Sequence, residues 1–572
     1  MWGSILAAVS SQIATTTDAI VVSNLIGPDA ISAINLMMPV LTLFSALMIL
    51  FGIGSSVVAA KAIGRRDEKE ANGVFTTAIL TSLSAGVALA MIVFIFSDII
   101  VAVLTGGDPR IYELALSYLQ AMCVAIPFLM MAGVIENFVK TDGNPKLVMT
   151  AVIAGSLLNL ILDIVFVKFL GMGIAGSAWA TGLNYVLAIG ICLVHFRKPT
   201  HSLKWSLERS RLKFYVKQSV TQGLPMSVNS LFLGGCIMLI NYIVLGAQGS
   251  DGIYCWSVCM QIFMIMQMVL TGIGSSIYAI GGIMMGEQDM EGLSILNRKC
   301  LLYACGSLSV ITVLIIIFPE FFGELFGNRS NDPINFLPIA LRAFSIMLVP
   351  YSLVALLRAT YQILGHIKLS LALSVLQLLL MVSFVWGFSY INPVVLWWGF
   401  PSSSMALLIG LVIYTITLHL KNRSLAAFSL IPEVENNESM NLSVKIDRES
   451  LEDALKQIAK FLSQNLDELT AYRVRLSCEE LMYNILDHAV KKNPEKHYFD
   501  IHIRIEKDNV NLLIKDDGRP FNPIIREENI KVQSADPSDR IGLKIVNSTA
   551  ESIDYKYMYN QNISMLKFQR TS

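Results

Sequence analysis

The stretch GSLLNLILDIVFVKFLGMGIAGSAWAT, from Gly155 to Thr181, decides the fold of the larger part of this chain. It sets an aspartate, Asp163, inside an apolar run that is long enough to cross a bilayer. An ionised side chain near a bilayer centre costs at least ~2.5 kcal/mol, so such residues usually face a bundle interior or a water-filled path. Asn159 lies four residues earlier, on the same face of the predicted helix. The stretch therefore predicts a membrane helix with a polar, functional face.

The composition divides the chain into two parts. Of the 572 residues 54% are apolar, which is too many for a soluble protein. Apolar segments follow one another up to residue 421, whereas residues 441–572 carry charges at the density of a soluble domain. The net charge of zero is uninformative about partners, and the eight cysteines show no spacing typical of disulfides or zinc.

We predict twelve membrane-spanning segments. They are approximately 2–25, 31–60, 75–104, 113–139, 147–169, 173–196, 217–245, 252–285, 299–326, 335–364, 368–391 and 395–420. Basic residues gather in the loops at 61–69, 140–146 and 197–217, and the opposite loops hold few. The positive-inside rule then predicts a multi-pass protein of the cell membrane with both termini in the cytoplasm.

The two halves of the apolar part resemble each other. The sequence GIGSS occurs at 52–56 and again at 272–276, and the loop around Gly143 matches the loop around Gly365. An offset of six helices keeps both halves in parallel orientation, an arrangement that many secondary transporters use to form a central cavity.

Several motifs occur in the order and spacing of one transporter family. They are TTDAIVVSNLIG (16–27), GIGSSVVAAKAIGRRDEKEA (52–71), TDGNPK (141–146), LNLILDIVF (158–166), MGIAGSAWAT (172–181) and GLPMSV (223–228). On these motifs residues 1–421 resemble the multidrug and toxic compound extrusion (MATE) transporters. The resemblance implies a twelve-helix, two-lobed antiporter that exchanges H⁺ or Na⁺ for organic, cationic or amphipathic, compounds.

The same resemblance implies a coupling site in the first lobe. Its members would be Asp18, Asn159, Asp163 and Thr181. The alternative is that Asp18 and Asp163 form hydrogen bonds between helices and bind no ion. The second lobe departs from part of the family, because the predicted helices at 217–245, 252–285 and 335–364 lack the coupling acids that some members carry there.

Residues 441–572 predict an α/β sandwich. Strands are expected at 441–446, 498–506, 509–516, 552–559 and 563–569, and helices at 449–466, 470–492 and 541–550. The pattern is that of a sheet with helices on one face.

Polar residues in this domain are not distributed as in a purely structural domain. Glu480, Asn484 and His488 recur every four residues and so share a helix face, and Asp516 and Gly518 lie at the end of a predicted strand. The segment DRIGLKIV, from 539 to 546, opens a helix whose N-terminal amides suit phosphate.

These features resemble the GHKL (Bergerat-fold) ATPases, above all their anti-sigma-factor serine kinase branch. The resemblance implies bound ATP and Mg²⁺, with Glu480 as general base or water-orienting carboxylate, Asn484 as magnesium ligand and Asp516 as acceptor for the adenine amino group. Gly518 and Gly542 would let the backbone approach the nucleotide. Pro520 and Arg540 stand where glycines are common, so a degenerate domain that binds no nucleotide is the alternative.

We therefore expect five regions and two competing functions. The regions are an N-lobe at 1–196, a cytoplasmic interlobe loop at 197–216, a C-lobe at 217–421, a linker at 422–440 and an ATPase-like domain at 441–572. The first function is ion-coupled export of small organic molecules, regulated by ATP. The second is a membrane-anchored signalling protein whose soluble domain acts as a serine kinase or binds a cytoplasmic regulatory protein. We expect no nucleic-acid partner. The sequence contains no Walker A motif, which argues against an ATP-driven pump of the ABC type.

Overall fold

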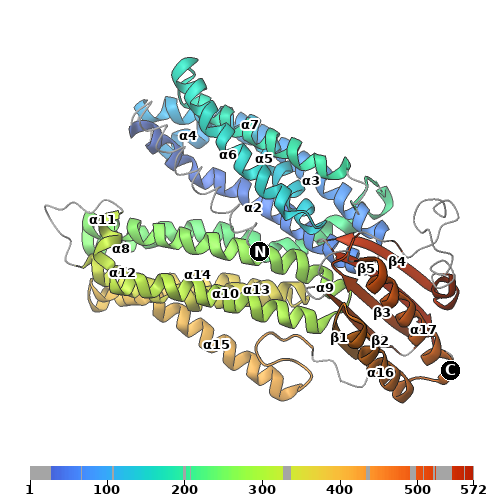
Figure 1. Cartoon of the computed structure of the whole chain (residues 1–572). Helices are drawn as coiled ribbons and strands as arrows, with labels where there is room; N and C mark the ends of the chain where they lie inside the picture. The colour runs from blue at the N-terminus through green and yellow to red at the C-terminus, as the bar shows by residue number, and fades with distance from the viewer. Residues whose placement is uncertain are drawn as a thin grey trace. The chain divides into compact units, whose positions relative to one another are not determined.

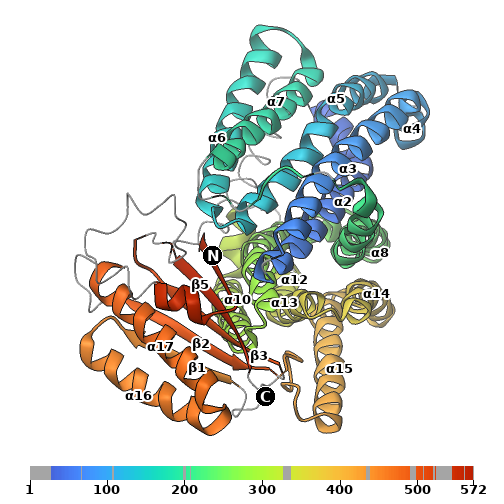
Figure 2. The same cartoon turned by 90° about the vertical axis from the view of Figure 1, so that its right-hand side faces the viewer.

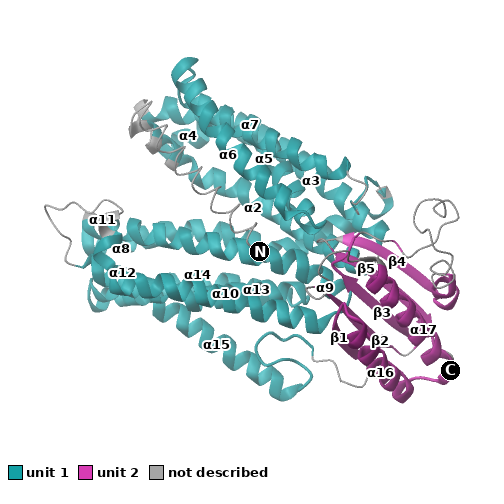
Figure 3. Cartoon of the chain, viewed as in Figure 1, with its two compact units in different colours: residues 1–432 teal, residues 433–572 magenta. Residues whose placement is uncertain are grey.

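The computed structural model divides the chain into two compact units, residues 1–432 and 433–572 (Figure 3). The described residues are 28–65, 67–105, 109–197, 201, 203–206, 208–325, 336–432, 439–489, 497–506, 508–519, 522, 544–558 and 561–570. Eleven helices among them are long and apolar enough to cross a membrane, and all eleven belong to the first unit. The predicted span at 2–25 lies outside the described residues, as do Asp18 and Gly542.

Five of the eleven spans form the first half of the membrane unit. They are α2 (Pro28–Gly64); α3 (Glu68–Ile95) with α4 (Ser97–Thr105); α5 (Pro109–Thr141); α6 (Pro145–Asp163) with the π-helical turn η1 (Ile164–Phe169); and α7 (Gly173–Leu193) with the 3₁₀ turn η2 (Val194–Arg197). Local signals set the helix ends. Asn144 caps α6 by accepting the Leu147 N–H at 3.3 Å, and Pro145 lies in the first turn, where its missing N–H costs nothing.

The other six spans form the second half. They are the two parts of α8 (Leu212–Ser276), the second continued by η4 (Ile277–Gly281) and α9 (Gly282–Gly286); α10 (Met290–Ile317), followed by the short α11 (Pro319–Leu325); α12 (Leu337–Ile346) with α13 (Leu348–Ile363); α14 (Ile367–Ile391); and η5 (Val395–Trp398) with α15 (Gly399–Lys421). Gly249 separates the two spans of α8 with a φ of 63°, a conformation that only glycine adopts at little cost.

The internal repeat predicted from the sequence is confirmed in the backbone. Gly143 follows α5 with a φ of 89°, and Gly365, 222 positions later, follows α13 with a φ of 90°. Asp67 and Asp289 are also 222 positions apart, and each caps the N-terminus of the next helix. The two halves therefore use the same turns at the same places.

Glycines bring the two halves into backbone contact along α2. A Cβ atom at Gly54 would overlap the carbonyl oxygen of Ser219 in α8, and one at Gly223 would overlap the carbonyl oxygen of Leu50. Nearer the end of α2, a Cβ atom at Gly286 would overlap the carbonyl oxygen of Lys61. We call this line of contacts the glycine seam. From it the helices of the two halves diverge (Figures 1 and 2).

The segment between the two halves crosses the start of α3. The Lys204 N–H donates to Asn72 Oδ1 at 2.7 Å, and the Ser206 N–H donates to Thr76 Oγ1 at 2.8 Å. Both acceptors belong to α3, so this part of the interlobe loop is fixed to the first half through its own backbone.

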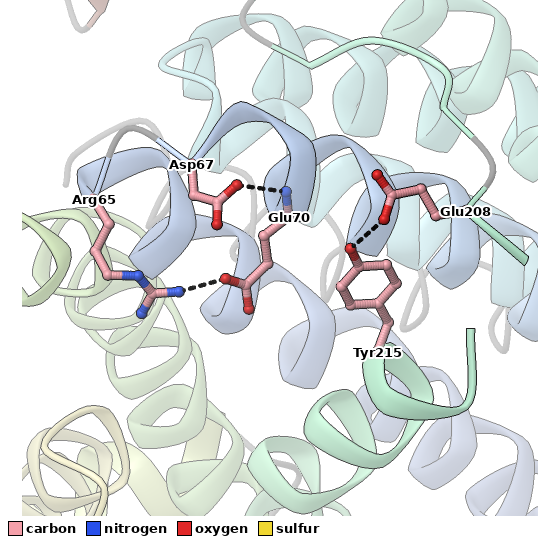
Figure 4. Close-up of polar contacts among 5 residues, drawn as sticks. All are labelled: Arg65, Asp67, Glu70, Glu208 and Tyr215. Carbon is pink, nitrogen blue, oxygen red and sulfur yellow. Dashed lines mark hydrogen bonds and ion pairs between the residues drawn. The ribbon is translucent and has the colours of Figure 1, made fainter. Parts of the chain in front are cut away.

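A polar cluster stabilises the same end of the membrane unit (Figure 4). Arg65 and Glu70 form an ion pair at 2.7 Å, and Asp67 Oδ1 accepts the Glu70 N–H at 2.9 Å. Tyr215, at the start of α8, donates its hydroxyl to Glu208 Oε2 at 3.2 Å. These contacts hold the loops that the sequence predicts to be cytoplasmic.

Residues 422–432 fold back onto the membrane unit. The Tyr361 hydroxyl of α13 donates to the Phe428 carbonyl oxygen at 2.6 Å, and the Leu430 side chain is 1% exposed. The first part of the linker expected at 422–440 is therefore a packed turn, because its apolar residues find a place against α13. The membrane unit ends at Pro432.

The second unit is an antiparallel sheet covered on one face by two helices (Figure 1). Its elements are β1 (Ser439–Lys445), α16 (Arg448–Asn465), α17 (Glu468–Asn484) with the π-helical turn η6 (Ile485–Ala489), β2 (Tyr498–Ile505), β3 (Asn509–Asp516), a helical segment at 544–549, β4 (Ser552–Met558) and β5 (Gln561–Gln569). The strand order is β1-β2-β3-β5-β4. The α/β sandwich predicted from the sequence is confirmed.

The alternation of side chains explains the single covered face. Phe499, Ile501 and Ile503 of β2 are at most 1% exposed and pack in one core with residues of α16 and α17. Residues between them on β2 point to the opposite side of the sheet. Asp447 and Asp467 cap the two helices by accepting backbone N–H groups at 2.8 and 2.9 Å.

The glycine seam yields a testable prediction. We expect Gly223→Ala to lower the thermal unfolding midpoint of the purified protein, because overpacking a close contact costs about 1–3 kcal/mol. Gly235→Ala is the matched control, since it lies in the same helix and its Cβ would meet no atom within 4 Å. Equal midpoints for the two variants would show that the helices are not in backbone contact at Gly223.

Candidate functional site

A polar pair joins α6 to α7 inside the first half of the membrane unit. Asn159 of α6 donates its Nδ2 hydrogen to the Thr181 hydroxyl of α7 at 3.4 Å. Asn159 is 6% exposed, and Asp163, one turn further along α6, is 0% exposed. The structure thus brings Asn159 and Thr181 together and places Asp163 on the same helix face.

The backbone changes at Asp163. This residue ends the α-helical part of α6, and the next six residues, Ile164–Phe169, form a π-helical turn. Such turns are rare and occur often at functional sites, because the wider spiral displaces side chains from regular positions. The π-helical turn therefore distinguishes Asp163 from the other residues of α6.

Close packing of α6 against α7 surrounds this pair. A Cβ atom at Gly155 would overlap the Asn184 side chain of α7, and one at Gly176 would lie 3.0 Å from the Phe166 Cβ. Small residues allow membrane helices to approach each other in this way. Asn184 thereby reaches the same face of α6 that carries Asn159.

Oxygen atoms give this site its chemistry. A carboxylate, a side-chain amide and a hydroxyl offer hard oxygen ligands, which suit a small cation such as Na⁺ or a proton held by the carboxylate. Asp18, the fourth member expected from the sequence, lies outside the described residues.

The second unit carries the expected nucleotide residues in two groups. The first group is on α17, where Asn484 Nδ2 donates to the Glu480 carbonyl oxygen at 2.7 Å. This bond leaves the Asn484 Oδ1 atom as an acceptor, and Asn484 is 9% exposed. As in α6, a π-helical turn begins directly after the polar residue.

The second group is at the end of β3. Asp516 Oδ1 accepts the Gly518 N–H at 2.9 Å and the Asn562 Nδ2 hydrogen at 2.7 Å. Asp516 is 6% exposed. The two bonds hold the carboxylate in one orientation and leave Oδ2 for a further donor. None of the described hydrogen bonds joins this group directly to Glu480 or Asn484.

Asn562 is a site residue that the sequence reasoning missed. It stands opposite Asp516 in the register of β3 and β5, and it is 3% exposed. Its Nδ2 also donates to the Arg519 carbonyl oxygen at 2.9 Å, and its Oδ1 accepts the Tyr555 hydroxyl at 2.6 Å. Only the strand register brings it there, and the strand expected at 563–569 begins one residue after it.

The segment after Gly542 is fastened to α17. Thr549 and Ser477 share a hydrogen bond of 2.9 Å between their hydroxyl oxygens. Gly542 itself lies outside the described residues. The end of the helical segment at 544–549 therefore lies next to the helix that carries Glu480 and Asn484.

The described residues fit a nucleotide with its metal. A buried, oriented carboxylate at Asp516 suits the amino edge of adenine, and a neutral amide oxygen at Asn484 suits Mg²⁺, which prefers oxygen ligands. When bound, Mg²⁺ would screen the phosphate charges.

Two carboxylates in this unit have raised pKa values. Burial raises the pKa of Glu480, and the charge of neighbouring Glu479 raises it further. Burial also raises the pKa of Asp516, whereas the hydrogen bonds from Asn562 and Gly518 act in the opposite direction. A carboxylate with a raised pKa is a better proton acceptor when it is ionised.

Comparisons with known proteins agree with both units. The MatE family model matches residues 4–165 and again 225–386, one match in each half of the membrane unit. The model of the histidine kinase-like ATPase domain matches residues 444–567.

Curated relatives are multidrug proteins of bacteria. The chain is 24% identical over 244 residues to "Multidrug export protein MepA" of Staphylococcus aureus (strain MSSA476), a match that covers 42% of this chain and 54% of the relative. It is 26% identical over 342 residues to "Probable multidrug resistance protein YoeA" of Bacillus subtilis (strain 168), covering 57% and 71%. The chain thus spans about half the length of the MepA proteins it matches.

Solved structures show the same membrane fold. Two of them carry the titles "Reverse polarity of binding pocket suggests different function of a MOP superfamily transporter from Pyrococcus furiosus Vc1 (DSM3638)" and "Outward-facing conformation of a multidrug resistance MATE family transporter of the MOP superfamily". Each matches with a TM-score of 0.65 at 24% identity and covers 71% of this chain and 92% of its own. Because the MatE model spans more than half of the sequence, the chain belongs to the MatE family, and its second unit is a histidine kinase-like ATPase domain.

Proposed function

We propose that this protein exports small organic molecules in exchange for H⁺ or Na⁺, and that its second unit binds Mg-ATP to regulate the exchange. The observation that carries the export proposal is the fully buried Asp163 beside the Asn159–Thr181 pair. A carboxylate at this depth is expensive unless it serves an ion path. The relative named a multidrug export protein supports the same activity for this chain.

In this proposal the side chains of α6 and α7 hold the coupling ion. Asp163 supplies the charge, Asn159 and Thr181 supply neutral oxygens, and Asp18 is the fourth member. An ion that neutralises Asp163 changes how well its helix fits the surrounding core, and this difference can favour one orientation of the transporter over another. The exported compounds are cationic or amphipathic.

The second unit modulates transport and does not drive it. A ligand shifts an equilibrium only by its different affinity for two states, so bound ATP acts by favouring one arrangement of the protein. Glu480, Asn484, Asp516, Gly518 and Gly542 form the nucleotide site in this proposal. The loops at 61–69, 140–146 and 197–217 carry most of the basic residues between the spans. These loops and the second unit therefore face the cytoplasm.

A signalling role is the second candidate, and one observation favours it. The second unit has a hydrophobic core of its own, so it can act on a cytoplasmic protein independently of transport. In that case Glu480 would accept the proton of a serine hydroxyl on a regulatory partner. Transport that is unaffected by ATP, together with phosphotransfer to a protein, would support this alternative.

The coupling site is tested by Asp163→Asn. We expect this variant to lose gradient-driven export in proteoliposomes, because the substitution keeps the shape and removes the charge that holds the ion. Separately imposed pH and sodium gradients, each with and without ATP, identify the ion. Asp98→Asn is the control. Asp98 lies at the start of α4, away from α6, and accepts a hydrogen bond from Tyr112 of α5. Full export by Asp163→Asn would refute the assignment.

The nucleotide site is tested by calorimetry with Mg-ATP. Asn484→Ala should lower affinity about tenfold or more in the presence of Mg²⁺ and change little without it, because it removes one metal ligand. Glu480→Gln should retain binding and lose slow hydrolysis or phosphotransfer. Equal Mg²⁺ dependence in wild type and Asn484→Ala would contradict the role of Asn484.

The raised pKa of Glu480 predicts that the rate of ATP hydrolysis or phosphotransfer falls on the acid side of its pH profile. A base works when it is deprotonated, so the rate should fall as the pH drops through a value above that of an ordinary glutamate. Glu479→Gln removes the neighbouring negative charge and should move this fall to lower pH. A pH profile that is identical in wild type and Glu479→Gln would argue against Glu480 as the base.

A further inference from the structure

The second half of the membrane unit buries a positive charge. Arg358, five residues before the end of α13, is 5% exposed. Its Nη1 donates to Asn229 Oδ1 of α8 at 2.5 Å and to Ser374 Oγ of α14 at 3.2 Å. Both partners are neutral and buried, at 7% and 0% exposure.

The surrounding helices offer this arginine no carboxylate. Between residues 212 and 421 every acidic residue lies at or beyond the end of a span, namely Asp251, Glu287, Asp289, Glu291, Glu320, Glu324 and Asp332. The described ion pairs do not include Arg358. An arginine inside a membrane protein usually pairs with an acid or marks a substrate pathway, because an uncompensated charge is costly there.

The geometry leaves one edge of the guanidinium for a ligand. The described hydrogen bonds of Arg358 use Nη1 alone, and they fix the plane of the group between α8 and α14. The Nε and Nη2 donors form the edge with which arginine grips a carboxylate or phosphate in two parallel bonds. Asn229 and Ser374 thus hold the guanidinium group of Arg358 in one orientation.

The internal repeat argues against a merely structural role for this charge. Arg358 lies 222 positions after Glu136, so the two residues occupy equivalent places in the two halves. In the first half, α5 carries an acid at this position before its glycine turn. In the second half, the equivalent helix α13 carries a base there. The fold therefore does not require a cation at this place.

We propose that Arg358, oriented by Asn229 and Ser374, binds the anionic group, a carboxylate, of a transported molecule within the second half of the membrane unit. The inference deepens the proposed function and rests on it, because it names part of the substrate. Molecules that carry an acid beside an organic cation would be bound better than their uncharged esters.

A matched pair of dyes tests this inference. Tetramethylrhodamine with a free carboxylate and its methyl ester share one aromatic cation and differ by one negative charge. Equilibrium binding of each to the full-length protein in lipid nanodiscs, without any gradient, is measured by fluorescence anisotropy. We expect the wild type to bind the acid about tenfold or more tightly than the ester, as befits a bidentate charged contact.

Three variants separate a ligand site from a structural arginine. Arg358→Gln should bring the acid-to-ester ratio close to one. Asn229→Asp should do the same while it maintains or raises thermal stability, because the new carboxylate lies against Nη1 and pairs with the arginine. Arg342→Gln is the control and should keep the wild-type ratio, since the described hydrogen bond of the exposed Arg342 goes to the Ile316 carbonyl oxygen.

The outcomes that would overturn the inference are distinct. A wild type without preference for the acid, or a preference that survives in both Arg358→Gln and Asn229→Asp, would refute it. A preference that added sodium chloride abolishes, but that sodium isethionate (a sulfonate) at the same ionic strength does not, would assign the site to an inorganic anion and would also refute it. Asp163→Asn should retain the preference although its export is lost, so a failure of ion coupling leaves the binding result intact.

Discussion

The absence of water from a bilayer core governs how the first unit uses its polar side chains. A buried donor, acceptor or charge there must find its partner within the protein or in a ligand. The unit nevertheless buries the Asp163 carboxylate in one half and the Arg358 guanidinium in the other. Asp163 lies one helical turn from Asn159, which donates to Thr181, and Arg358 donates to Asn229 and Ser374.

The same constraint explains the glycine seam. Apolar side chains gain little from each other in lipid, so helices associate where their backbones can approach closely. Gly54 and Gly223 bring α2 and α8 into such contact, and Gly286 repeats it nearer the end of α2. The two polar sites therefore belong to halves that are in backbone contact along this seam.

Much of this architecture could be predicted from the sequence, because long apolar runs and period-two strands carry strong signals. Most span boundaries, the repeat and the strand at 509–516 follow from such patterns. The spans expected at 75–104 and 299–326 instead begin at Glu68 and Met290, because each helix starts at a capping aspartate ahead of its apolar run. Three features could not be predicted. Asn562 reaches Asp516 through strand register, and a π-helical turn after Asp163 has no sequence signature. The local sequence also does not show which helix the apolar residues of the turn at 422–432 pack against. The place of Asn562 and the packing of the turn depend on contacts between segments that are distant in the sequence.

The hydrogen bond from Tyr361 to the Phe428 carbonyl oxygen has a mechanical consequence. Tyr361 is three residues from Arg358 on the same rigid helix, α13, and Phe428 belongs to the turn that ends the membrane unit. A displacement of α13 must therefore stretch this bond or carry the turn with it. The chain continues from that turn toward the second unit, so a displacement of the helix that bears the buried arginine would be transmitted to the start of the segment that leads to the ATPase-like domain.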